Sequence, residues 1–115
     1  MDIKNVNEFI EYSDKSFIKK VIFSTKEQLC FVLNFKQGQS LPTHKHENSS
    51  LVLTVLSGAG NIKINDNVQS MEQGSVVMAT GQDDFGIPNV TEDMSILVTI
   101  SPNPANHMYS QNIEG

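Results

Sequence analysis

The sequence contains no arginine and no tryptophan, and all of its lysines lie in residues 1–63. Arginine supplies the planar, two-pronged grip on carboxylates and phosphates, so its absence argues against the usual form of such sites. Residues 64–115 hold seven acidic residues and no lysine, and the net charge of the whole chain is −5. A nucleic-acid surface needs clustered cations, so we expect no nucleic-acid partner.

Long apolar runs are also absent. No stretch approaches the ~20 apolar residues that a membrane helix needs, and no basic start followed by an apolar segment indicates a secretory signal. We therefore expect no membrane partner. Cys30 is the single cysteine, which excludes an internal disulfide and fits a reducing compartment. The expected location is the cytoplasm.

The length of 115 residues predicts one domain, with a barrel core over about residues 16–102 and a polar tail, including His107, over residues 103–115. A short helix is expected over residues 5–12, capped by Asn5 or Asn7. After it, short apolar runs separated by turn-forming residues predict about eight strands. These strands are expected at residues 17–23, 29–35, 51–56, 62–64, 68–71, 75–79 and 95–100, and at the segment that carries His44 and His46.

The strand pattern predicts an all-β sandwich or barrel. The small and polar run at residues 57–60 predicts a turn after the strand at 51–56, and Asp66-Asn67 predicts a hairpin turn. Such a short all-β chain must also protect the edges of its sheets. Pairing of two subunits would do so, and we therefore expect a homodimer.

The segment His44-Lys45-His46 carries the clearest chemical signal in the sequence. Two imidazoles two residues apart on an extended segment point to the same side of a sheet. Such a pair can present two nitrogen ligands to one metal ion. It can equally serve as a polar grip on a bound ligand.

Residues 38–60 resemble the first motif of the cupin family, which runs Gly, five residues, His-x-His, three or four residues, Glu, six residues, Gly. Gly38, His44, His46 and Gly58 fall at the motif positions. Residues 74–89 are similar in outline to the second motif, with its glycine and asparagine matched by Gly74 and Asn89. The resemblance spans about residues 28–102. It implies a double-stranded β-helix, which is a jelly-roll barrel.

The sequence departs from the metal-binding pattern that the resemblance implies. Cupins usually hold their metal with two His and one Glu from the first motif and one His from the second. Here His44 and His46 match, whereas the Glu position falls on Leu51 or Ser50 and the second His position falls on Phe85. Asp84 is a candidate third ligand if the strand shifts by one residue. The resemblance thus leaves open a weakly held divalent ion (Zn, Fe, Mn or Ni).

Three functions remain open at this point. The first is a barrel that binds a small molecule, with His44, His46, Leu51, Phe85 and Asn89 at the ligand pocket. The second is a metal-dependent enzyme of the dioxygenase or isomerase type, of the kind common among cupins. The third is a structural dimeric barrel without a ligand. Because the loss of metal ligands affects catalysis more than folding, we favour the binding module.

Overall fold

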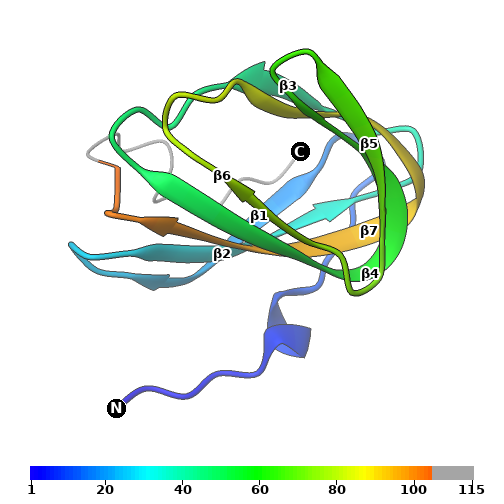
Figure 1. Ribbon diagram of the computed structural model, residues 1–115. Helices are drawn as coiled ribbons and strands as arrows, with labels where there is room; N and C mark the ends of the chain where they lie inside the picture. Colours follow the sequence, from blue (N-terminus) through cyan, green and yellow to red (C-terminus); the bar gives the residue numbers. More distant parts are fainter. Residues whose placement is uncertain (105–115) are drawn as a thin grey trace.

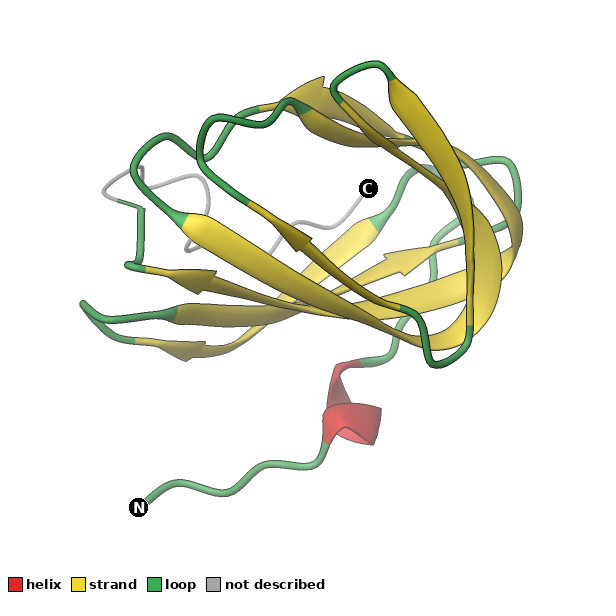
Figure 2. Ribbon diagram, in the orientation of Figure 1, coloured by secondary structure: helices red, strands yellow, loops and turns green. Residues whose placement is uncertain are grey.

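The computed structural model describes residues 1–104, and these residues form a β-barrel preceded by an extended N-terminal segment (Figure 1). Figure 2 shows that the one helical element in this range is a short turn. The elements of the described residues are η1 (Val6–Phe9), β1 (Ile18–Ser24), β2 (Leu29–Phe35), β3 (Leu41–His44), β4 (Ser50–Ile64), β5 (Asn67–Glu72), β6 (Val76–Ala79) and β7 (Phe85–Ser101). The tail predicted at residues 103–115 lies, from residue 105 onward and with His107, outside the described residues.

Two long antiparallel strands, β4 and β7, run through the barrel and pair with each other over most of their length (Figure 1). The second half of β7 also pairs with β2, which in turn pairs with β1. The first half of β7 pairs with β3, while β4 pairs with β6 near its start and with β5 near its end. This connectivity is a double-stranded β-helix, and it confirms the predicted all-β jelly-roll class.

The turn predicted at residues 57–60 is wrong, because β4 continues through it. The pairing of β4 with β7 shifts register several times between Val55 and Lys63, which bends the long strand around the barrel. Gly58 makes one of these bulges: its φ is +82°, and a Cβ atom there would lie 2.0 Å from the backbone oxygen of Asp93. A glycine is therefore required here by a close approach of two strands rather than by a chain reversal.

The barrel interior is filled by the inward-facing residues of five strands. In β4, Leu51, Leu53 and Val55 alternate with more exposed residues, as expected for a strand with one buried face. In β2, residues on both faces are buried, because the second face is covered as well. The core cluster consists of Leu29, Phe31, Leu33, Phe35, Leu51, Leu53, Val55, Ile62, Met71, Ala79, Phe85, Ile87, Val90, Met94, Ile96, Val98 and Ile100.

The N-terminal segment is tied to the outer face of β2 and β7 by a chain of hydrogen bonds. The Tyr12 hydroxyl lies 2.7 Å from Ser95 Oγ, which donates to Asn34 Oδ1, and Asn34 Nδ2 donates to the Phe9 carbonyl oxygen. The helix expected over residues 5–12 is consequently shorter. It is capped by Asn5 as predicted, but the chain is extended from Ile10 onward so that it can lie against the sheet.

The surface of the described residues has few large apolar groups. The exposed ones on strands are Val52, Val68, Val76 and Met78, three of which lie on the adjacent strands β4 and β6. No helix among the described residues is long and apolar enough to cross a membrane. Subunit pairing stays a prediction, since β1 and β6 have partners on one side only within the described chain.

Candidate functional site

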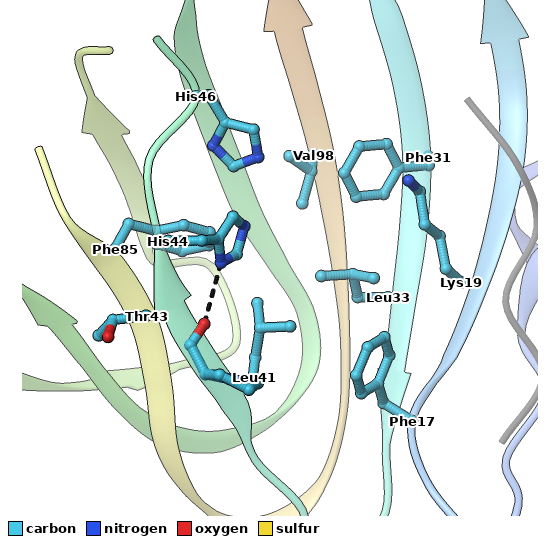
Figure 3. Close-up of a pocket in the computed structure, with 11 residues that line it drawn as sticks. Phe17, Lys19, Phe31, Leu33, Leu41, Thr43, His44, His46, Phe85 and Val98 are labelled. Carbon is cyan, nitrogen blue, oxygen red and sulfur yellow. Dashed lines mark hydrogen bonds between the residues drawn. The ribbon is translucent and has the colours of Figure 1, made fainter. Parts of the chain in front are cut away.

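A cavity of about 280 Å³ opens inside the barrel between β1 and β2 on one side and β3 with the start of β7 on the other. Figure 3 shows His44, His46 and Phe85 on one side of this cavity and Phe31 and Lys19 on the opposite side. Most of the lining is apolar, and the polar side chains are those of Lys19, Thr43, His44 and His46. The full lining is Phe17, Lys19, Phe31, Leu33, Leu41, Pro42, Thr43, His44, His46, Phe85 and Val98.

His44 is the last residue of β3, and its orientation is fixed by its own strand. Its Nδ1 lies 2.9 Å from the Pro42 carbonyl oxygen, the hydrogen bond drawn in Figure 3. A carbonyl oxygen can only accept, so Nδ1 carries the hydrogen and donates it. In the neutral imidazole, Nε2 therefore carries the lone pair. A ring oriented in this way can accept a hydrogen bond or act as a metal ligand through Nε2.

His46 lies beyond the end of β3, in a tight turn that returns the chain toward β4. The Ser49 amide donates to the His46 carbonyl oxygen at 3.0 Å, and Asn48 has a positive φ of 68°. Gly81 packs against this turn so closely that a Cβ atom there would lie 2.7 Å from the His46 carbonyl oxygen. These contacts bring the two imidazole centroids to 4.6 Å, although the two residues do not share one regular strand as we expected.

Lys19 is the unexpected member of the site. It lies in the middle of β1, and its side chain is only 3% exposed. Its ammonium nitrogen is 4.4 Å from the centroid of the Phe31 ring, an attractive cation–π distance. A barrel wall that is otherwise apolar thus carries a positive charge at the cavity.

Burial and charge displace the pKa values of two of these groups. Loss of hydration lowers the pKa of Lys19 from 10.5 to about 8, so the amine is still mostly protonated at pH 7. The pKa of His46 falls from 6.5 to about 4, first because of burial and then because of the charges of His44 and Lys19. At neutral pH the site therefore combines an ammonium group with a neutral imidazole, which has one donor and one acceptor nitrogen.

Phe85 occupies the position where the resemblance implied a second-motif histidine. It pairs with His44 across β3 and β7, and its ring centroid lies 5.3 Å from that of His44 and 6.0 Å from that of His46. Residues directly opposite each other in an antiparallel pair bring their side chains together. The structure therefore brings Phe85 and both histidines into one wall of the cavity.

The other residues predicted for the pocket lie elsewhere. Leu51 is buried in the core between Ala79 and Ile100, and it is not part of the cavity lining. Asn89 is exposed and pairs with Asn61 on the bulged part of β4 and β7. Asp84 is exposed too, because the hydrogen bonds of its amide and carbonyl groups with Asn65 hold its backbone at the surface.

The donor set of this site does not fit a resident metal ion. Structural and catalytic metal sites usually have three or four protein ligands, and the described residues contain no group of three or more His, Cys, Asp or Glu side chains able to hold an ion. His44 and His46 supply two nitrogen donors, and Phe85 fills the third corner with an apolar ring. The ammonium of Lys19 also acts on His46 with a positive charge, which opposes a cation there.

Sequence reasoning missed Lys19 and several apolar lining residues, including Phe17, Leu41 and Val98. A signal for Lys19 was present. In a strand that contains Lys19-Lys20, successive side chains point to opposite faces, so one of the two lysines must point toward the interior. Phe17 and Val21 share the face of Lys19, which would have selected Lys19 rather than Lys20.

The cupin domain family model matches residues 31–100, and the chain therefore belongs to the cupin family. This membership confirms the resemblance carried by Gly38, His44, His46 and Gly58. No curated protein matches the sequence.

Solved structures similar to this chain support the same class. An RmlC-like cupin protein from Desulfovibrio desulfuricans is 30% identical, with a TM-score of 0.80 over 89% of this chain and 97% of that one. A protein with a double-stranded β-helix domain from Klebsiella pneumoniae is 22% identical, with a TM-score of 0.83 over 92% and 94%. A predicted oxalate decarboxylase from Thermotoga maritima is 22% identical, with a TM-score of 0.69 over 74% and 80%. The last two, at this identity, show the fold alone.

Proposed function

We propose that this small cupin domain binds a small organic molecule in the cavity inside its barrel. The observation that carries the proposal is a largely apolar cavity into which the polar groups of Lys19, His44 and His46 converge. Ligand sites are typically concave and apolar, with a few polar groups that orient the ligand. The volume of about 280 Å³ lies near the lower end for such sites and suits a small molecule rather than a peptide.

A methyl NMR titration against a panel of small molecules tests this proposal. The Leu33 and Val98 methyl groups line the cavity, so binders are expected to shift their resonances in a saturable way, whereas the exposed Val76 methyls remain unchanged. Leu41→Phe narrows the cavity and is expected to weaken binding at least about tenfold. Val52→Phe adds the same kind of bulk on the exposed face of β4 and is expected to leave binding unchanged. Shifts that never saturate, or equal affinity in both variants, would contradict the proposal.

The alternative function, a metal-dependent enzyme, is favoured by one observation: the Pro42 carbonyl orients His44 so that Nε2 is the ligating nitrogen. With two imidazoles, an ion would depend on water or substrate oxygens for its other ligands. Elemental analysis of protein purified without chelator decides between the two functions. Stoichiometric zinc, iron, manganese or nickel that is lost in His44→Ala and His46→Ala would favour the enzyme. Metal content unaffected by these variants would leave the binding module as the better account.

Two further properties belong to the proposal. We infer a homodimer in which the exposed apolar residues Val52, Val76 and Met78 of β4 and β6 lie against the second copy. We also keep the cytoplasm as the proposed location, since the single cysteine requires no oxidising compartment. Light scattering of the wild type and of Met78→Lys tests the first inference: the wild type should have the mass of a dimer and the variant a lower mass.

A further inference from the structure

Lys19 places a positive charge inside the cavity. The residue is 3% exposed, its ammonium lies against the Phe31 ring, and it lines the same cavity as the two histidines. An ammonium in such surroundings has lost most of its hydration, which lowers stability unless other charges or dipoles offset the loss. A chain that needed only a packed barrel would have an apolar residue at this position of β1.

The charges around the cavity are uneven. Within the described residues, the lining contains a lysine and two histidines but no aspartate or glutamate, although the whole chain has 13 acidic residues and 8 basic ones. The net charge of the protein is negative, whereas the formal charge of the cavity wall is positive. A low-dielectric wall strengthens the interaction of such a charge with any charged group that enters.

We propose that the molecule bound in the cavity is a small organic anion, an apolar body that carries one carboxylate, with the carboxylate against Lys19. The inference rests on the proposed function and names the chemical class of its ligand. The apolar body packs against Phe17, Leu33 and Val98, while the carboxylate lies between Lys19 and the histidine wall, which Figure 3 shows facing each other. There it accepts hydrogen bonds from the ammonium and from an imidazole N–H.

A monocarboxylate fits these groups better than a phosphate ester or a cation. A phosphate carries up to two negative charges and is usually bound by several cations or backbone amides, and the cavity offers one ammonium. A ligand amine would be repelled by Lys19, since like charges in a desolvated site are unfavourable. A neutral ligand would leave the Lys19 charge without a counter-charge from the ligand. The carboxylate is the class for which charge, number of donors and apolar surface agree.

Matched triplets of compounds test the inference, each with one apolar body and three head groups. Benzoate, benzamide and benzylamine form one triplet, and cyclohexanecarboxylate and 4-methylpentanoate, with their amides and amines, form two more. Isothermal titration calorimetry and methyl NMR of the wild type are expected to give at least about tenfold tighter binding of a carboxylate than of its amide, with the amine weakest. Phenyl phosphate serves as the phosphate comparison and is expected to bind more weakly than benzoate.

Lys19→Met keeps the length of the side chain and removes its charge, and Lys20→Met is its matched control on the same strand. In Lys19→Met the preference for carboxylate over amide is expected to fall to about one, while the amide binds as before. Lys20, which pairs with Glu11 at 3.2 Å, does not line the cavity, and its variant is expected to keep the full preference.

The outcomes separate this inference from the proposed function. Saturable binding in the cavity with no preference for carboxylate, or a preference that survives in Lys19→Met, would overturn the anion and leave a cavity that binds small molecules. Absence of saturable binding across the triplets and the wider panel would overturn both.

Discussion

Lys19→Met should raise the free energy of unfolding at pH 7 by up to about 3 kcal/mol, because the variant removes a charge that folding buries. Burial lowers the pKa of Lys19 from 10.5 to about 8, and a difference of this size between folded and unfolded chains corresponds to a stability loss of that order while the amine is protonated in both. Methionine fills similar space with apolar atoms. The substitution is thus expected to stabilise the ligand-free protein.

The pH dependence identifies the cause. Between pH 8 and 10.5 the unfolded chain still holds the proton that the folded chain has released, so the stability of the wild type should rise with pH across this window. The advantage of Lys19→Met should shrink over the same window. Urea unfolding of both proteins at pH 7, 9 and 10.5 measures it, with Lys20→Met as the control that stays close to the wild type throughout. A Lys19→Met protein less stable than the wild type at pH 7 would show that the charge is stabilising.

His46 should make the protein sensitive to mild acid. Its pKa is about 4 in the folded protein and near 6.5 in an unfolded chain, so below pH 6.5 the unfolded chain binds a proton that the folded one does not. The stability that the neutral imidazole retains above pH 6.5 is lost as the pH falls to 4. The loss amounts to at most about 3 kcal/mol, because one pKa unit corresponds to roughly 1.4 kcal/mol.

His46→Gln keeps a polar side chain without a titrating ring and is expected to flatten the profile between pH 6.5 and 4. Urea unfolding at half-unit steps across this range measures the difference between variant and wild type. His44→Gln, on the same wall but only half-buried, should keep most of the fall. Parallel profiles for the wild type and His46→Gln would indicate that the imidazole is charged in the folded state.

The fold was predictable where the hydrophobic pattern is simple. The strand expected at residues 29–35 has these bounds in the structure, because a continuous apolar run between turn residues has few other interpretations. The start of β7 was missed. Pro88, Asn89, Glu92 and Asp93 are exposed there, so a strand that extends from Phe85 to Ser101 has the composition of a loop over its first half. The motif spacing located the barrel, whereas local propensity alone could not define its longest strands.

The site was predicted in part, and the missing part depends on the three-dimensional path of the chain. The sequence placed His44, His46 and Phe85 together because they are close in a family motif, and the structure gathers them at the cavity. Lys19 reaches the cavity from β1, which pairs with β2 on the far wall. No motif spacing links β1 to the histidines. Leu51 and Asn89 were expected at the pocket from alternation and motif alignment, and the bulges of β4 and β7 change the faces that such alternation predicts.

The most direct test of the account is a crystal structure of the protein soaked with the carboxylate that binds most tightly in calorimetry, compared with Lys19→Met treated in the same way. We predict that the apolar body lies against Leu33 and Phe31, and that the carboxylate lies within hydrogen-bond distance of Lys19 Nζ and an imidazole of the histidine wall. The Lys19→Met crystal should show no carboxylate in that place. A metal ion held by His44 and His46 with further protein ligands, or a ligand bound only outside the barrel, would contradict the account.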